Sequence, residues 1–531
     1  MKGPFKVLVT DKIDPRGLNP LAEHPGIELV MAVKPATERL EELVPSAHAW
    51  LVRSETKITE PWLKKASQLR LIGRAGVGVD NIDVAGASRR GIAVINAPAA
   101  NTISACEHTW GLLLALSRNI PQADRDVKEG RWERSKWMGV ELAGKTLGLV
   151  GLGRIGREVA KRARAFGMRV VAYDPFISQK VAEGLGVELA AFKELLGVSD
   201  YVSLHVPSSD KTRHMIDEES LGWFKKGARL VNCARGELVK ESALVEAVKS
   251  GALLGAALDV YEKEPLPESS ELRELPQVIL TPHLGASTKE AQLKVAEELS
   301  KSVLEFYEKG MARSAINLPG FDPDALEALG ASLGLAEKLG RFLGQMLDAG
   351  LKGISCRFHG DFQPSERHPL AVAAVKGVLS TILEATLSYI NAPILALERG
   401  IELSESAAPS PEGFARLMTV TAVTDRGERS VSGTVGENGE PRIVRLDHLF
   451  VDVSPKGKML VLVNKDEPGV IGAVGTLLGR HRINIADMRV GRESPQGEAV
   501  MVITIDEDLT AELQSELKTL EGIKAVRWVV L

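Results

Sequence analysis

The sequence contains few cysteines and no excess of one charge. Its three cysteines, Cys106, Cys233 and Cys356, are far apart among 531 residues and lack the spacing of metal ligands. We therefore expect neither a disulfide framework nor a zinc site, and a reducing compartment is the simpler interpretation. The formal net charge is only -4, which argues against the strongly basic composition typical of nucleic-acid-binding proteins.

Long apolar runs are absent as well. The N-terminal residues Met-Lys-Gly-Pro-Phe-Lys lack the apolar core of a signal peptide. No uninterrupted apolar run reaches the ~20 residues that a membrane-spanning helix needs. We therefore expect a cytoplasmic protein that does not bind membranes or nucleic acid. Its length exceeds what one hydrophobic core organises, so we expect about three or four domains of roughly 150 residues each.

The most informative stretch is the glycine-rich run at residues 145–156. An apolar strand at 146–150 leads into Gly151, Gly153, Arg154, Ile155 and Gly156, a GxGxxG spacing, and a helical pattern follows to residue 166. A second strand at 169–173 ends at Asp174, near the ~20-residue distance of the acid that holds the adenosine ribose. GxGxxG alone is weak evidence in a chain with 50 glycines, but strand, helix and acid in register predict a dinucleotide-binding domain.

The first hundred residues alternate short apolar strands with helical stretches, which indicates a parallel sheet covered on both faces. The strands are expected at 6–10, 27–33, 49–52, 69–73 and 92–95. Ligands of such sheets bind beyond the carboxyl ends of the strands, where Arg53-Ser54 and Arg74 stand. Either arginine alone could be solvated or paired with a carboxylate, but two beside glycine-rich turns favour an anionic substrate.

Two features follow before the glycine-rich run. Residues 104–119 read as a helix whose apolar face is wider than a surface helix needs, so we expect it to bridge domains or contact another subunit. Residues 128–136 are strongly basic around Trp132 and include Arg134. This segment is either a solvated loop or an arm that reaches a phosphate, and the pattern leaves both readings open.

Beyond the glycine-rich run, strands expected at 201–205, 228–232, 253–258 and 278–280 each lead into distinctive residues. These are Val206, then Cys233, Ala234 and Arg235, then Asp259, and finally His283 with Gly285 and Ala286. Because parallel strands present their carboxyl ends at one edge, we expect Arg235, Asp259 and His283 to line the nicotinamide half of the cleft. A capped helix at 287–310 should then return the chain to the first domain, which would make that domain discontinuous.

The remainder predicts two further modules. After a linker at 317–323, helices are expected at 326–347 and 370–390 and strands at 416–423, 430–435 and 442–446, with Asn438-Gly439 as a hairpin turn. This module is α+β and shows no catalytic constellation. From residue 458 the order becomes strand, helix, strand, strand, helix, strand, the ferredoxin-like βαββαβ pattern. The helix N-terminus after Gly469 could hold a carboxylate, or the module could simply be a packing unit.

The motifs GLGRIG, NCARGE, ALDVYEKEP and TPHLGAST resemble those of the D-2-hydroxyacid dehydrogenase family over residues 1 to about 310. RAGVGVDNID, GRWERSKWMG and the C-terminal extension are similar to the long-form D-3-phosphoglycerate dehydrogenases. The resemblance implies NAD-dependent oxidation of 3-phosphoglycerate, homodimers or homotetramers, and regulation by L-serine. It also implies the fold, which is a flavodoxin-like substrate domain (1–100, completed by 284–315), a Rossmann NAD-binding domain (101–283), an intervening α+β domain (316–455) and a ferredoxin-like ACT domain (456–531).

The same resemblance implies site residues. Arg235 would bind the substrate carboxylate, His283 would transfer the proton and Glu264 would orient His283. The NAD contacts would be Val77, Gly151, Gly153, Arg154, Ile155, Gly156, Asp174, Val206, Cys233, Ala234, Arg235, Asp259, His283, Gly285 and Ala286. The substrate contacts would be Arg53, Ser54, Arg74, Asn101 and Arg134, the last across a dimer, and the serine contacts Asn464, Asp466 and Asn484. Val77 and Val206 replace threonines of some relatives, so only backbone contacts are expected there.

The residue types suit this chemistry. A histidine with an ordinary pKa near ~6.5 can take the hydroxyl proton, and an arginine can hold a carboxylate with two parallel hydrogen bonds. Asp174, with no arginine in residues 175–179, favours NAD over NADP. Two alternatives stay open: a sister enzyme acting on another 2-hydroxy acid, and a non-catalytic sensor or corepressor of the same fold.

Overall fold

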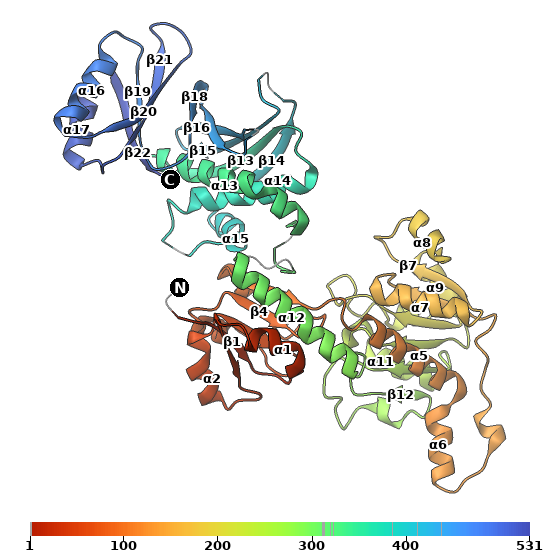
Figure 1. Ribbon diagram of the computed structural model, residues 1–531. Helices are drawn as coiled ribbons and strands as arrows, with labels where there is room; N and C mark the ends of the chain where they lie inside the picture. Colours follow the sequence, from red (N-terminus) through yellow and green to blue (C-terminus); the bar gives the residue numbers. More distant parts are fainter. Residues whose placement is uncertain are drawn as a thin grey trace.

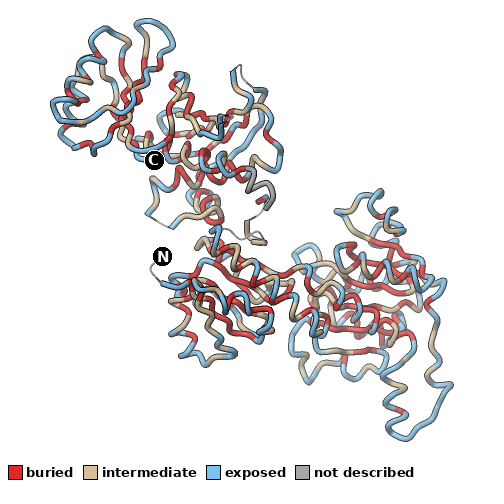
Figure 2. The backbone as a smooth tube through the Cα atoms, viewed as in Figure 1, coloured by how far each residue is buried: buried red, intermediate tan, exposed pale blue. Residues whose placement is uncertain are grey.

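The structure is a computed structural model that describes residues 3–310, 314–318, 320–321, 323–384, 386–410, 413–436 and 438–531, with the backbone alone at 323–328. Within these residues the strands form four sheets, each with its own helices (Figure 1). Buried residues concentrate in the sheets and on the inner faces of the helices that cover them (Figure 2). No described helix combines the length and the hydropathy needed to cross a membrane.

The first sheet is parallel, with strand order β2-β1-β3-β4-β5, as the flavodoxin-like prediction requires. Its strands are β1 (Phe5–Val9), β2 (Ile27–Met31), β3 (Ala49–Val52), β4 (Leu71–Arg74) and β5 (Ala93–Asn96). Its helices are α1 (Pro15–Ala22), α2 (Thr37–Leu43), α3 (Glu60–Lys65), α4 (Val84–Arg89) and, from much later in the chain, α12 (Lys289–Lys309). Val295, Leu299 and Val303 of α12 share a buried cluster with Val7 and Val9 of β1, so the first sheet is covered by two separate parts of the sequence.

The second sheet is also parallel, in the order β12-β11-β10-β9-β6-β7-β8. Its strands are β6 (Thr146–Val150), β7 (Arg169–Tyr173), β8 (Glu188–Leu189), β9 (Tyr201–Leu204), β10 (Arg229–Asn232), β11 (Gly255–Leu258) and β12 (Val278–Leu280). Its helices are α5 (Thr102–Arg118), α6 (Ile120–Lys128), α7 (Arg154–Ala165), α8 (Gln179–Leu185), α9 (Phe192–Val198), α10 (Glu218–Leu221) and α11 (Glu241–Lys249). The strand order reverses between β6 and β9, which is where a doubly wound sheet opens its ligand crevice.

The wide apolar face of α5 is used inside this second unit. Trp110 stacks on Phe166 at 4.7 Å between ring centroids. Cys106 and Leu113 are buried with Val159 of α7 in one cluster. The breadth of the apolar face therefore reflects packing against α7 and the sheet beneath, and an interdomain or intersubunit contact is not needed to explain it.

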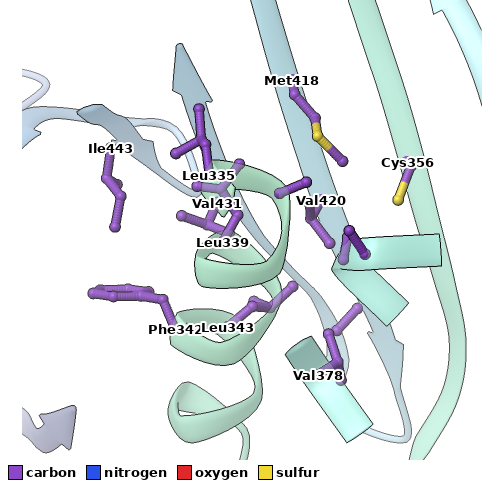
Figure 3. Packing of buried hydrophobic residues seen from close by; sticks show 14 of the residues in the cluster. Leu335, Leu339, Phe342, Leu343, Cys356, Val378, Met418, Val420, Val431 and Ile443 are labelled. Atoms are coloured by element: carbon purple, nitrogen blue, oxygen red, sulfur yellow. The ribbon is translucent and has the colours of Figure 1, made fainter. Parts of the chain in front are cut away.

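The third sheet has six strands in the order β14-β13-β15-β16-β17-β18. They are β13 (Leu351–Gly360), β14 (Glu402–Ala408), β15 (Arg416–Thr424), β16 (Gly427–Val435), β17 (Pro441–Leu446) and β18 (Leu449–Val453), accompanied by α13 (Pro323–Met346), α14 (Pro364–Leu379) and α15 (Asn391–Leu397). Figure 3 shows Leu335, Leu339 and Phe342 of α13 facing Val420 and Val431 of the sheet.

Two predictions for this third unit need correction. The helix expected at 370–390 ends at Leu379, because the Ser380 and Thr381 hydroxyls donate to the carbonyls of Gly377 and Val378 and so replace the continuing helical bonds. Residue 385 of that range, and residues 319 and 322 of the expected linker, lie outside the described residues. β13, β14 and β18 were not expected; β14 is an edge strand of sequence ELSESAA, which has no alternating apolar pattern to reveal it.

The fourth sheet has the order β20-β21-β19-β22, with all neighbours antiparallel. Its strands are β19 (Lys458–Lys465), β20 (Ile485–Arg492), β21 (Glu498–Ile505) and β22 (Ile523–Val530), and its helices are α16 (Val470–Arg480) and α17 (Ala511–Thr519). Every element of the predicted βαββαβ pattern is therefore present, and the ferredoxin-like fold is confirmed.

Candidate active site

The turn between β6 and α7 has the geometry of a pyrophosphate-binding turn. Gly151 has φ +99°, which disfavours any residue with a Cβ. A Cβ on Gly156 would lie 2.2 Å from the carbonyl oxygen of Gly151, so only glycine lets the helix approach so closely. A Cβ on Gly153 would meet nothing within 4 Å, which leaves open space in front of the N-terminus of α7. This space and the helix N-terminus fit the phosphates of a dinucleotide.

Asp174 lies beside this turn, at the end of β7. Its Oδ2 accepts a hydrogen bond of 2.8 Å from the backbone N–H of Leu152, and its Oδ1 accepts one of 2.9 Å from Phe176. These bonds hold the carboxylate next to the glycine-rich turn, at the position where an acid can bind ribose hydroxyls.

An imidazole and a carboxylate face each other at the same rim. Nδ1 of His283 lies 2.8 Å from Oε2 of Glu264, and the two side chains are 48% and 38% exposed. His283 has φ +56°, an uncommon conformation for a residue with a Cβ. Glu264 also accepts a hydrogen bond from the backbone N–H of Tyr261 through Oε1, at 3.2 Å. The ring therefore keeps Nε2 available for a ligand while the carboxylate holds Nδ1.

Asp259 fastens the loop that carries His283. Its side chain is 1% exposed, and it accepts hydrogen bonds from the backbone of Leu284 and Gly285 and from the Thr281 hydroxyl, at 2.6–2.8 Å. Burial alone would raise the pKa of this carboxyl, but hydrogen bonds from His108, Thr281 and Leu284 outweigh burial and hold the pKa below its usual value. Asp259, expected to contact NAD, is thus enclosed by its own loop.

Arg235 follows β10 in a turn that Asn232 braces. The Asn232 amide donates to the carbonyl of Arg235 and accepts from the N–H of Ala234, at 2.8 and 3.0 Å. The guanidinium Nε of Arg235 lies 3.3 Å from Oδ2 of Asp80. A Cβ on the next residue, Gly236, would lie 1.9 Å from the backbone of Tyr261, so the loops that carry Arg235 and Glu264 touch.

A second guanidinium, that of Arg74, lies close to the first. Burial, helped by the charge of Arg235, lowers the pKa of Arg74 to about 10. Its Nε is buried and has no hydrogen-bond partner among the described residues. A Cβ on Gly76 would come within 1.7 Å of Arg74 and one on Gly78 within 2.0 Å of Arg235. The Gly76-Val77-Gly78 segment therefore makes room for two cations, an arrangement that an anion would stabilise.

The remaining predicted substrate contacts divide into two groups. Arg53 is close enough to add to the positive field at Arg74, and the Oδ1 of Asn101, at the start of α5, is buried without a partner in the described chain. Arg134 instead stacks over Trp132, with its guanidinium carbon 5.9 Å from the ring centroid. It belongs to the arm formed by α6 and residues 129–138, which Figure 1 shows on the side of the second sheet away from β1. One chain thus does not bring Arg134 to the other arginines.

The uncharged residues that were predicted to contact the cofactor lie around the crevice and have ordinary contacts within the chain. The carbonyl of Val77 accepts from the Asn96 amide at 2.5 Å, and Val206 follows β9 beside Gly151. Burial raises the pKa of the Cys233 thiol to about 12, so this side chain is uncharged at the crevice. Ser104 on α5 donates to the carbonyl of Gly285 at 2.9 Å, which ties the His283 loop to α5.

Three polar residues at this site were missed by the sequence interpretation. His108 contacts Asp259 at 3.0 Å, Asp80 contacts Arg235, and Asp11 lies under the loop that begins with Arg53. Asp11 follows β1 by two residues and Asp80 lies in the segment after β4, and a position beyond a strand end was an available signal. His108 lies within a helix and carried no such signal.

The predicted effector residues lie in the fourth unit, but not together. Asn464 is 3% exposed and its Oδ1 has no partner among the described residues. Asp466 pairs with Arg492 at 2.7 Å. Asn484 precedes β20, whose Ile485 is level with Ile505, and Ile505 pairs with Lys458 at the far end of β19. Within one chain Asn484 is therefore at the opposite end of the sheet from Asn464 and Asp466.

Comparison with known proteins covers all of these units. The family model of the D-isomer specific 2-hydroxyacid dehydrogenase NAD binding domain matches residues 110–285, that of the D-3-phosphoglycerate dehydrogenase intervening domain matches 328–447, and that of the ACT domain matches 458–522.

Full-length relatives match as well. A D-3-phosphoglycerate dehydrogenase of Synechocystis is 43% identical, covering 98% of this chain and 93% of its own, and one of Bacillus subtilis is 41% identical, covering 99% and 100%. A crystal structure of D-lactate dehydrogenase from Aquifex aeolicus complexed with NAD and lactic acid is 32% identical, covers 57% of this chain and 96% of its own, and has a TM-score of 0.52. By these matches, of which the full-length relatives cover 98–99% of the chain, the chain belongs to the D-3-phosphoglycerate dehydrogenases.

Proposed function

We propose that this protein oxidises 3-phospho-D-glycerate to 3-phosphohydroxypyruvate with NAD, the first step of the phosphorylated route to L-serine. The observation that carries this proposal is the pair of His283 and Glu264 beside Arg235, at the rim next to the glycine-rich turn. Reduction by NADH should be the favoured direction at equilibrium.

In this reaction His283 is the acid-base group. Its Nε2 takes the proton of the C2 hydroxyl, while Glu264, 2.8 Å from Nδ1, orients the ring and stabilises its protonated form. Arg235 binds the C1 carboxylate through two parallel hydrogen bonds and so directs C2 toward the nicotinamide. The glycine-rich turn and Asp174 would hold NAD, which would supply the acceptor for the hydride of C2. Asp259 acts by holding the 283–285 loop rather than by touching the cofactor.

The substrate phosphate is assigned to Arg53, Ser54, Arg74 and Asn101. The unpartnered Nε of Arg74 and Oδ1 of Asn101 support this assignment, because both are buried polar atoms that a ligand would satisfy. Arg134 of a second copy completes the phosphate site. A substrate with both a carboxylate and a phosphate explains why three cationic side chains, Arg53, Arg74 and Arg235, gather around one glycine-rich segment.

We also propose that the chain works as a homo-oligomer in the cytoplasm, as a dimer or tetramer. The arm formed by α6 and residues 129–138 is braced internally, since Asp126 accepts hydrogen bonds from Arg131, Lys136 and Trp137. It nevertheless exposes apolar side chains, with Trp132 73% and Met138 80% exposed. A rigid arm with an apolar outer face suits contact with a second copy.

The proposed domain boundaries assign one role to each part of the chain. Residues 1–100 with 284–315 bind the substrate, 101–283 bind NAD, 316–455 form the intervening domain and 456–531 form the ACT domain. In the ACT domain, L-serine is held by Asn464 and Asp466 of one chain and Asn484 of another. The separation of Asn484 from the other two within one chain supports a site shared between two copies.

The decisive experiment follows NADH absorbance with 3-phospho-D-glycerate, D-glycerate and D-lactate. The proposal requires turnover with a clear preference for the phosphorylated substrate. Preference for an unphosphorylated acid would favour a sister dehydrogenase, and binding of NAD without any turnover would favour a sensor or corepressor. Neither alternative explains Arg53, Arg74 and Arg235 together with an intact His283–Glu264 pair.

A further inference from the structure

The loop that follows β3 is held from below by a buried carboxylate. Asp11, which follows β1 by two residues, is 1% exposed. Its Oδ2 accepts hydrogen bonds from the backbone N–H groups of Arg53, Glu55 and Thr56 at 2.6, 3.1 and 3.1 Å. Its Oδ1 accepts from the N–H of Thr56 at 3.1 Å and from the Thr56 hydroxyl. Both carboxylate oxygens therefore hold this loop, and the charge of Asp11 also favours the protonated form of the nearby Arg74.

The same loop is held from its other side by an amide. The Nδ2 of Asn81, in the segment after β4, donates to the carbonyls of Arg53 at 3.1 Å and Thr56 at 2.6 Å. Because β1 and β4 are the two neighbours of β3 in the sheet, the loop is clamped between them. The Asp11 carboxylate accepts hydrogen bonds from the N–H groups of the loop, and the Asn81 amide donates hydrogen bonds to its carbonyl groups. We call these two residues and their hydrogen bonds the clamp.

The clamp omits one residue of the loop. Ser54 makes no hydrogen bond to any other described residue, through either its N–H or its hydroxyl, and its side chain is at the surface. Arg53 likewise uses only its backbone in the clamp, and its guanidinium contributes to the positive field at Arg74. The clamp therefore presents the N–H and hydroxyl of Ser54 and the guanidinium of Arg53 as free donors in one fixed turn.

We infer that Asp11 and Asn81 are positioning residues that preset this turn for the phosphate of the substrate, and so determine the preference for a phosphorylated over an unphosphorylated 2-hydroxy acid. This inference rests on the proposed assignment of Arg53 and Ser54 to the phosphate. A negative residue beneath a phosphate site is unfavourable by charge alone. Its presence is explained if the turn has to be ordered before the anion arrives, because an already ordered site loses less entropy on binding.

The test compares kcat/KM for 3-phosphohydroxypyruvate and for hydroxypyruvate in Asp11→Asn. Asparagine has the same shape, but its NH₂ group would face an N–H or hydroxyl donor of the loop in either orientation. Losing hydrogen bonds to a charged acceptor should raise the KM for the phosphorylated substrate roughly 10- to 100-fold. The KM for NADH and the rate with hydroxypyruvate should stay within about 2-fold, so the ratio between the two substrates should fall.

Three companions make the result decisive. Asn81→Ala should lower the same ratio from the other side of the loop. Asp14→Asn is the matched control, since Asp14 caps α1 and pairs with Arg16 at the surface. Arg53→Ala tests the phosphate assignment itself.

The outcomes distinguish the positioning role of Asp11 and Asn81 from the proposed function. An unchanged ratio in both Asp11→Asn and Asn81→Ala, beside a lowered ratio in Arg53→Ala, would overturn the inference and leave the proposed function intact. An equal loss with both substrates would also overturn it, because that is the signature of a purely structural role. An unchanged ratio in Arg53→Ala would count against the phosphate assignment and would overturn the inference that rests on it.

Discussion

At the scale of single residues, the same side chain has different chemistry according to its enclosure. His283 is half exposed and paired with Glu264, whereas His205, one residue past β9, is less exposed and pairs with Ser203 at 2.9 Å. Glu264 is 38% exposed and contacts the imidazole of His283. Asp259 is 1% exposed, and it accepts hydrogen bonds from the loop that carries His283. Accessibility therefore separates the groups that can meet a substrate from those that shape the site.

Replacing His283 tests the acid-base role. His283→Ala should lower kcat by about 10²- to 10⁴-fold, because the hydroxyl proton would lose its acceptor while the substrate keeps its arginine contacts. Steady-state kinetics in both directions measure this effect. An unchanged kcat would exclude His283 from proton transfer.

The arginines should act on affinity. Arg53→Ala and Arg134→Ala should each raise the KM for 3-phosphoglycerate roughly 10-fold or more and lower kcat much less, because a phosphate remote from C2 is bound equally in the ground and transition states. For Arg134 the effect also requires a second copy. A fall in kcat at unchanged KM would assign these residues a different role.

His205 should make stability depend on pH. Burial lowers its pKa from 6.5 to about 4, so the folded protein resists a proton that the unfolded chain accepts readily. The free energy of unfolding is therefore unaffected above pH ~6.5 and decreases as pH falls toward 4. The loss relative to neutral pH amounts to about 2 kcal/mol at pH 5. His205→Gln should therefore lose less stability between pH 7.5 and pH 5, measured by urea unfolding of the NAD-binding unit. A loss equal to that of the wild type would contradict this assignment.

At the scale of elements, the candidate site residues are concentrated where strands of the two parallel sheets end. In the first sheet the ends of β1, β3 and β4 supply Asp11, Arg53 and Arg74. In the second, the ends of β6, β7 and β10 supply the glycine-rich turn, Asp174 and Arg235. Because all strands in each sheet are parallel, these residues meet at one edge although they are distant in sequence.

We expect the end of β7 to decide the choice between NAD and NADP. The Asp174 carboxylate beside the Leu152 N–H would repel a 2′-phosphate, and no arginine in residues 175–179 could bind one. We expect NAD to be preferred over NADP in kcat/KM at equal concentrations. Asp174→Ala should narrow that preference. A wild-type preference for NADP would mean that Asp174 does not face the ribose.

At the scale of the whole molecule, the third and fourth units are attached to the first unit. The side chain of Asn317 accepts from the N–H of Val94 and donates to Ser88 and Ile92, each at 2.9 Å. α15 also packs against α4 of the first unit. The third unit in turn contacts the fourth through β18 and β20. The ACT domain is therefore connected to the first sheet by continuous packing through the third unit.

Serine should bind the ACT domain and inhibit turnover through this path. Binding should be lost in Asp466→Ala and Asn484→Ala, and inhibition requires a difference in affinity between two conformations of ~1 to 3 kcal/mol. Calorimetric titration measures binding and the turnover assay measures inhibition. No heat with the wild type, or binding unaffected by both substitutions, would refute this site.

The sequence by itself determined the local features of this protein. The glycine-rich turn and the order of strands and helices in the first and fourth units follow from periodicity and turn residues, which depend only on near neighbours in the chain. Polar residues at strand ends also indicated Arg53, Arg74, Arg235 and His283, because a parallel sheet brings such ends together.

Only the tertiary structure decided which side chains meet. That Asp11 folds the Arg53 loop, that Asp80 contacts Arg235 and that His108 contacts Asp259 depend on packing between segments far apart in sequence. The edge strand β14 was likewise decided by its pairing with β13, which no local pattern reveals. Asn484 stands apart from Asn464 for the same reason, since the register of β20 on β21 sets its place.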